Sequence, residues 1–120
     1  MSLPWKDKLF DFALLDDKEN YDLMVHATKA TFQNLTKPDI INVKDKEGQT
    51  TLMVNCIYCK TTKLVEFMLD NGADLQITCN NGSSIFDFIK LNKHNMSKQL
   101  LDVIGTRYLQ TDEVLPQLTL

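Results

Sequence analysis

Three cysteines and His94 are the side chains whose spacing in this sequence first suggests metal binding or redox chemistry. Cys56 and Cys59 have the C-x-x-C spacing of zinc ligands and of redox-active dithiols, and Cys79 with His94 would complete a set of four ligands. A structural zinc site uses two closely spaced ligand pairs, whereas this chain has one, and no strand is predicted before Cys56 to support a thioredoxin-like dithiol. We therefore predict free thiols, no metal site and no cofactor.

No other group of residues in the sequence predicts an enzyme. His26 and His94 are far apart in the chain, and neither has a neighbouring nucleophile or orienting acid. Ser83 and Ser84 lie at a predicted helix start, where helix capping accounts for them. The Asn-Gly pairs that end at Gly72 and Gly82 are typical of turns and do not form a nucleotide-binding pattern. We predict no catalytic residues.

Composition limits the classes of function further. The 120 residues, 43% of them hydrophobic, suffice for one domain with a modest core. The formal net charge of −3 argues against nucleic-acid binding, which depends on clustered Lys and Arg. The sequence has no apolar run long enough to span a bilayer, and Lys6, Asp7 and Lys8 interrupt the place of a secretory signal. The lack of both features predicts a cytoplasmic protein without a membrane partner. Three cysteines, which form no even disulfide framework, agree with a reducing compartment.

The N-terminal third of the chain predicts a helical hairpin. Apolar residues within 3–15 lie mostly on one helical face. A polar break over residues 16–20 precedes a second amphipathic run, for which we predict a helix from Glu19 to Asn34. Since a proline disfavours a helical backbone in the residue before it, Pro38 predicts a connector over residues 36–41.

The segment 42–75 predicts one complete unit of turn, helix, loop and helix. Asp45 and Gly48 supply the turn, and Thr50 follows at a position suited to a helix N-cap. Apolar residues at helical spacing then predict two helices, the second of which stops at Gly72. A glycine suits that position because it accepts the left-handed backbone of many helix ends.

This order of residues resembles the ankyrin repeat, whose pattern is Asp-x-x-Gly-x-Thr-Pro-Leu-His, a small pair, an apolar helix and Gly-Ala-Asp. The matching residues are Asp45, Gly48, Thr50, Leu52, Gly72, Ala73 and Asp74. The chain departs from the pattern at Thr51, Met53, Asn55, Cys56 and Cys59. The resemblance implies an all-α fold, a short ankyrin-repeat solenoid of stacked helix pairs with an N-terminal helical-hairpin cap.

A weaker copy of the same pattern follows Ile77. Residues 79–84 parallel residues 45–50, with Gly82 in the turn and Ser84 at the N-cap. Two further apolar runs predict helices, the second of which ends at Gly105.

The resemblance divides the chain into an ankyrin-repeat domain, residues 1–105, and a C-terminal segment, residues 106–120. Within the domain it implies a capping hairpin over 1–38, a repeat over 39–76 and a second repeat over 77–105. The apolar residues of the C-terminal segment are Val114, Leu115, Leu118 and Leu120. They leave two alternatives, a lid folded over the last helix pair or a tail available to a partner.

Binding residues can be carried over from the family only where the pattern matches. Ankyrin repeats contact partners through their turn tips and through the end of each first helix. At the turn tips the resemblance implies Lys46, Glu47, Gln49, Asn80, Asn81 and Ser83. At the helix ends it implies Ile57, Tyr58, Leu91 and Asn92. Large apolar side chains at a helix end are typical of interface anchors, and the alternative is that they pack inward.

The function that the resemblance implies is binding of another protein through the concave face, without chemistry, as an inhibitor or an adaptor. One alternative is a structural subunit that acts by self-assembly or within a larger complex, because two repeats leave a small core and an exposed end. A second alternative is a metal or redox switch based on the cysteines. We expect a monomer or weak self-association.

Overall fold

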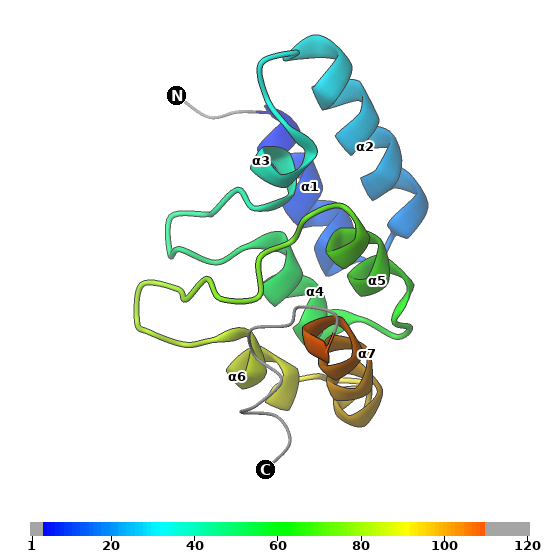
Figure 1. Ribbon diagram of the computed structural model, residues 1–120, viewed down its shortest axis with the longest axis vertical. Coiled ribbons are helices and arrows are strands. Elements are labelled where there is room, and N and C mark those ends of the chain that lie inside the picture. Colours follow the sequence, from blue (N-terminus) through cyan, green and yellow to red (C-terminus); the bar gives the residue numbers. More distant parts are fainter. Residues whose placement is uncertain (1–3, 110–120) are drawn as a thin grey trace.

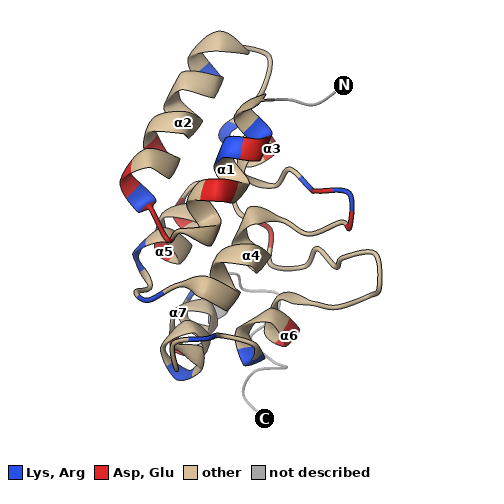
Figure 2. Cartoon of the chain, turned by 180° about the vertical axis from the view of Figure 1, so that it is seen from behind, with Lys and Arg blue, Asp and Glu red and all other residues tan. Residues whose placement is uncertain are grey.

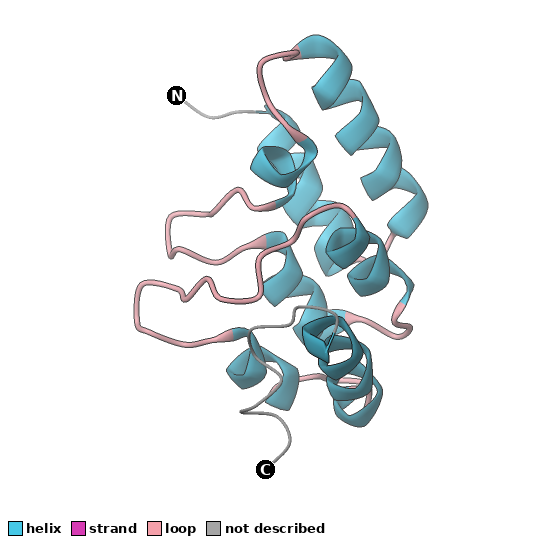
Figure 3. Ribbon diagram, viewed as in Figure 1, coloured by secondary structure: helices cyan, strands magenta, loops and turns pink. Residues whose placement is uncertain are grey.

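The computed structural model describes residues 4–109, with side chains as far as Arg107. Within this part of the chain it contains helices and no strand (Figures 1 and 3). The helices are α1 (Pro4–Leu14), α2 (Lys18–Thr31), α3 (Lys37–Ile41), α4 (Thr51–Tyr58), α5 (Lys63–Asp70), α6 (Ile85–Lys90) and α7 (Ser97–Leu109). The predicted all-α class is confirmed for the described residues.

Six of these helices form three pairs in two layers (Figure 1). In one layer α1 packs on α4 and α4 on α6, and in the other α2 packs on α5 and α5 on α7. Each pair, α1 with α2, α4 with α5 and α6 with α7, joins one helix of each layer. The fully buried apolar side chains of the paired helices include Leu9, Met53, Leu64, Met68, Ile89, Leu100 and Ile104. Burial of these side chains is the main term that holds the layers together.

Polar side chains between the pairs fix how the pairs stack. The Asn55 amide donates to the Ala13 carbonyl oxygen and to Asp16 Oδ1, at 3.0 Å each. The other oxygen of Asp16 accepts the Lys60 backbone N–H at 2.9 Å. On the opposite side of α4, Asn92 Nδ2 donates to the carbonyl oxygen of Cys56 at 2.8 Å. The α4–α5 connection is therefore held from both neighbouring pairs.

The prediction that residues 36–41 form a connector is wrong. Residues Lys37–Ile41 are helical, with Thr36 as N-cap. Thr36 Oγ1 accepts the Asp39 N–H at 3.1 Å, and the Asp39 carboxylate accepts the Thr36 N–H at 2.8 Å. Pro38 falls in the first turn of the helix, where a backbone N–H has no intrahelical partner and its loss costs little.

Two predicted helix ends also differ from the structure. α2 ends at Thr31, three residues before the predicted Asn34. α7 continues past Gly105 to Leu109. Arg107 in that additional turn forms an ion pair with Asp70 at the end of α5, so the additional turn contacts the neighbouring pair. The rest of the predicted C-terminal segment, residues 110–120, lies outside the described residues.

Candidate protein-binding surface

Two connections project beside each other from the same side of the helical layers (Figure 1). We call them the first turn, residues 45–50, and the second turn, residues 79–84. In the first turn the Asp45 N–H donates to the Gln49 carbonyl oxygen at 2.9 Å. In the second turn the Cys79 N–H donates to the Ser83 carbonyl oxygen at 3.0 Å. The predicted correspondence of the two segments is therefore found in their backbone hydrogen bonds.

Each turn leads directly into a helix. Thr50 is the N-cap of α4, and its hydroxyl oxygen accepts the Met53 N–H at 3.3 Å. Ser84 is the N-cap of α6, and its backbone N–H donates to the Asp87 carboxylate at 2.9 Å. Both predicted N-caps are confirmed. A capped start fixes the direction in which the chain enters the helix, and so it fixes where the turn points.

Hydrogen bonds join the tips of the two turns. The Asn80 N–H donates to the Glu47 carbonyl oxygen at 2.9 Å, and Asn80 Nδ2 donates to the Lys46 carbonyl oxygen at 3.0 Å. Gly48, with φ of 80°, lies against Asn80 so closely that a Cβ there would meet the Asn80 side chain at 2.4 Å. The tips therefore form one rigid edge, which presents the exposed side chains of Lys46 and Glu47 together with Asn81.

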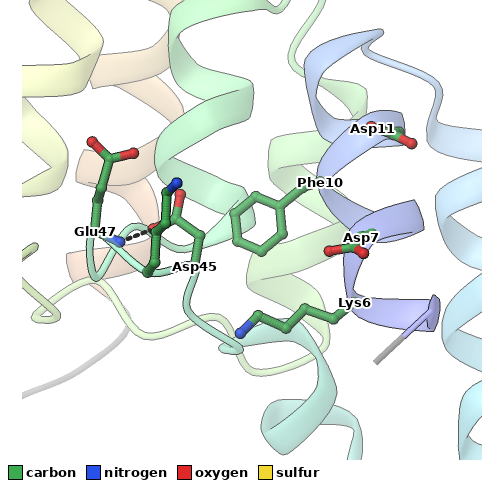
Figure 4. Close-up of a pocket in the computed structure, with 7 residues that line it drawn as sticks. Lys6, Asp7, Phe10, Asp11, Asp45 and Glu47 are labelled. Atoms are coloured by element: carbon green, nitrogen blue, oxygen red, sulfur yellow. Dashed lines mark hydrogen bonds between the residues drawn. The ribbon is translucent and has the colours of Figure 1, made fainter. Parts of the chain in front are cut away.

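A cleft of about 460 Å³ separates the first turn from α1 (Figure 4). Its lining residues are Lys6, Asp7, Phe10, Asp11, Asp45, Lys46 and Glu47. The Phe10 ring lies between α1 and the turn, with carboxylates on both sides of it (Figure 4). An aromatic ring flanked by charged side chains suits a polypeptide ligand. The ring offers apolar contact area, and the charged groups offer directional hydrogen bonds.

Charge distinguishes the two turns (Figure 2). The first turn carries Asp45, Lys46 and Glu47, and it faces the charged side of α1. The second turn, residues 79–84, carries no charged residue. Charges of both signs in one cleft favour a single orientation of a bound polypeptide. They also repel a polypeptide that places like charges at the same positions.

The predicted helix-end residues lie at the far ends of α4 and α6 from the turns. Ile57 and Tyr58 are half-buried, and Ile57 packs against the core. Leu91 is 60% exposed. The side chain of Asn92 is half-buried, and its Oδ1 accepts the N–H groups of His94 and Met96 at 2.8 and 2.9 Å. The structure thus gives Ile57 and Asn92 packing roles, while partner contact by all four stays a prediction.

Four residues of this cleft were missed by the sequence analysis, namely Lys6, Asp7, Phe10 and Asp11 of α1. The sequence places them in the first helix of the predicted capping hairpin and gives them no binding role. No local signal could have placed them, because the cleft exists only once α1 packs on α4.

The cysteines are buried and have free thiols. Burial raises the pKa of the Cys56 thiol, and the neighbouring Cys59 adds to the shift. Burial, followed by the charge of Asp16, raises the pKa of Cys59 to about 11. Because the thiolate is the reactive and metal-binding form, both shifts oppose redox chemistry and metal binding at neutral pH. Among the described residues no group of three or more His, Cys, Asp or Glu is arranged to hold a metal.

Comparison with known proteins gives one informative match. This chain is similar to an ankyrin repeat protein. The relative is Ankyrin repeat protein OPG025 of Monkeypox virus, 30% identical over 84 residues, which cover 68% of this chain and 13% of the viral protein. The chain thus spans a small part of that relative. No protein-family model matches, and no solved structure matches. Within residues 4–109 no helix is long and apolar enough to cross a membrane.

Proposed function

We propose that this chain is an ankyrin-type repeat module that binds another protein through the surface formed by α1, α4, α6 and the two turns. The observation that supports this proposal most directly is the cleft beside Phe10, which is lined by this aromatic side chain and by charged residues of α1 and of the first turn. The turn-to-turn hydrogen bonds support the proposal, because a surface that is rigid before binding loses little conformational entropy on binding. In this proposal the module has the capping hairpin, the two repeats and the solenoid stacking that the resemblance implies.

The proposed partner is a protein segment that places an apolar side chain on Phe10 and charged groups against Lys46 and Glu47. The module acts without chemistry of its own, in the cytoplasm, either as an inhibitor that covers a partner's surface or as an adaptor within an assembly. Neither nucleic acid nor a membrane is the proposed partner. The mixed charges of the cleft support this choice, since a phosphate backbone requires an excess of positive charge.

The proposal is tested by affinity capture from the native host with matched double variants. Phe10→Ala combined with Lys46→Ala removes the cleft's aromatic floor and one of its charges. Leu23→Ala combined with Lys63→Ala likewise removes one large apolar side chain and one lysine, at exposed positions of α2 and α5 in the other layer. We expect the first variant, shown to be folded by circular dichroism, to lose proteins that the control and the wild type retain. An identical set of captured proteins would refute the cleft as the binding site.

A third variant separates the cleft from the helix ends. Tyr58→Ala combined with Leu91→Ala removes the predicted anchors at the far ends of α4 and α6. We expect a smaller loss of captured protein than for the cleft variant, because Tyr58 is half-buried and Leu91 stands alone at a helix end. If this variant alone loses partners, the binding surface lies at the helix ends and the cleft is not used.

Self-assembly is the second candidate function, and one observation favours it. The helix pair α6–α7 leaves Leu91 and Leu101 60% and 47% exposed. A second copy that buried these side chains would produce a mass that rises with protein concentration. Sedimentation at increasing concentration is the measurement, and a constant monomeric mass would contradict this candidate.

A further inference from the structure

The connections that follow α4 and α6 lie against each other, at the ends of these helices that are far from the two turns. Asn92 Nδ2 donates to the carbonyl oxygens of Cys56 and Cys59, at 2.8 and 3.2 Å. The Lys93 N–H donates to the Ile57 carbonyl oxygen at 2.8 Å. The two connections therefore form a second joined surface, separate from the joined turn tips.

Lysines gather on this surface, although the formal net charge of the chain is −3. Residues 57–65 and 88–101 contain no acidic residue. Figure 2 shows lysines on the α6–α7 connection and at the neighbouring ends of both helices. The lysines of the two connections and their flanking helix ends are all exposed, and we call them the lysine edge: Lys60, Lys63, Lys90, Lys93 and Lys98.

Contacts within the described part of the chain do not account for the lysine edge. No ion pair there includes one of its lysines, whereas Lys18 and Arg107 each pair with an aspartate. Lys63 and Lys98 lie in the first turns of α5 and α7, where a positive charge opposes the helix dipole. Lysines that do not stabilise the chain and that repel one another create a positive potential, which favours an anionic partner.

Leu91 adds an apolar group to the lysine edge. It is the C-cap of α6, it lies between Lys90 and Lys93 in the sequence, and it is 60% exposed. A ligand that fits this surface supplies negative charges to the lysines and an apolar side chain to Leu91. An acidic polypeptide supplies both, whereas the backbone of a nucleic acid supplies phosphates alone.

Carboxylates border the lysine edge and limit the length of an anion that it can hold. Asp16 accepts the Lys60 N–H at 2.9 Å, and Asp87 precedes Lys90 by three residues on the same helix face. Both would repel a polyanion that extended past the lysines. We propose that the lysine edge binds a short acidic segment of a partner protein, with carboxylates on the lysines and an apolar side chain on Leu91.

This surface goes beyond the cleft of the proposed function and differs from it in charge. The cleft is lined by two lysines and four carboxylates, so it disfavours the acidic segment that the lysine edge attracts. The cleft lies beside the start of α4, and the lysine edge lies at the other end of that helix. One module can therefore hold two different segments.

The test measures binding of a defined peptide to the full chain by fluorescence anisotropy. The probe is a labelled peptide of glutamate and leucine with about twelve residues, which would span about 18 Å as a helix. Lys90→Gln combined with Lys98→Gln should weaken its binding about fivefold, as expected for the loss of two exposed charge pairs. Lys8→Gln combined with Lys44→Gln removes the same charge at exposed positions outside the lysine edge and should weaken binding less than about twofold.

A second peptide tests the apolar contact. It carries serine in place of leucine and should bind the wild-type chain about threefold more weakly. Leu91→Ala should weaken binding of the leucine peptide by about the same factor and should leave binding of the serine peptide unchanged. Circular dichroism first shows that each variant is folded.

Four results would overturn the proposal. They are absence of peptide binding, equal losses for the two lysine pairs, equal binding of the two peptides, and tighter binding of a DNA duplex that carries the same charge as the peptide. The Phe10→Ala, Lys46→Ala variant should bind the leucine peptide as the wild type does. Loss of binding in that variant would assign the peptide to the cleft, which would refute the lysine edge and leave the proposed function intact.

Discussion

The two turns share one backbone geometry and differ in almost every side chain. In the first turn a single Asp45 oxygen accepts the N–H groups of Glu47 and Gln49, both at 2.9 Å. The second turn has Cys79 at the position of Asp45, and there Asn81 Oδ1 accepts the Ser83 N–H at 3.0 Å and the Cys79 thiol at 2.8 Å. The same hydrogen-bonded turn is thus held by a carboxylate in one case and by an amide in the other.

Their surroundings differ as well. The first turn lies between α1 and the second turn, and its Gly48 is buried against Asn80. Gly82 has nearly the same φ, 86° against 80°, yet a Cβ there would meet nothing within 4 Å. The positive φ therefore favours glycine in both turns. The neighbouring atoms decide how much stability is lost when another residue replaces it. The first turn is part of the cleft and the second turn supports it.

The largest expected difference between the turns is the effect of adding one methyl group to each glycine. Gly48→Ala should lower the free energy of unfolding by about 2–4 kcal/mol, because the left-handed backbone is strained for alanine and the methyl group meets Asn80. Gly82→Ala should lower it by about 1–2 kcal/mol, from backbone strain alone. Urea unfolding of both variants measures the difference. Equal losses would show that Asn80 moves away without cost.

The second expected difference concerns the side chain that holds each turn. Asp45→Ala removes the acceptor of two N–H groups and should lower the free energy of unfolding by about 1–2 kcal/mol. Asn81→Ala removes the acceptor of one N–H group and should lower it by about 0.5–1 kcal/mol. The pair is compared by urea unfolding at constant pH and salt. A larger loss for Asn81→Ala would reverse our ranking of the two turns.

The third prediction tests the contact between the turns. Asn80→Ala removes the hydrogen bond to the Lys46 carbonyl and should lower the free energy of unfolding by about 0.5–1 kcal/mol. In the Gly48→Ala background the same change also relieves the side-chain clash. The double variant should therefore lose about 1 kcal/mol less stability than the sum of the two single losses. Thermal unfolding of the two single variants and the double variant closes this cycle. Additive losses would mean that the turns are energetically independent.

The smallest expected effect comes from making the second turn resemble the first. Cys79→Asp places a carboxylate where the first turn has Asp45, and in the Asn81→Ala background it should restore about 0.5 kcal/mol of stability by accepting the Ser83 N–H. Cys79→Ala in the same background is the control, since it removes the thiol without adding an acceptor. If both substitutions behave alike, the correspondence of Asp45 and Cys79 does not extend to their side chains.

Local features of the fold could be predicted because they depend on residues close in sequence. The N-caps at Thr50 and Ser84, the positive φ at Gly48 and Gly82 and the start of each paired helix follow from neighbours within a few positions. The connector predicted at Pro38 is the exception. There Thr36 and Asp39, three residues apart, form a capping box that starts a helix, and this local signal outweighs the effect of Pro38 on the residue before it.

The sequence locates part of the candidate surface, while partner binding there stays a prediction. Lys46, Glu47 and Asn80 belong to the joined turn tips, but the cleft beside them needs Phe10 and the charged side of α1. Those residues are about 35 positions away in sequence, and hydrophobic spacing in α1 does not say which of its apolar side chains stays half-exposed.

Residue types and short-range hydrogen bonds are enough to predict the six paired helices, the two turns and the absence of charge on the second turn, but not α3 or the ends of α2 and α7. Tertiary packing was needed to bring α1 beside the first turn, to place Asn80 against Gly48, to pair Arg107 of α7 with Asp70 of α5 and to leave Leu101 partly exposed. Each of these depends on which elements meet in the two layers. That choice is made by packing many buried side chains together, and no single segment carries the information.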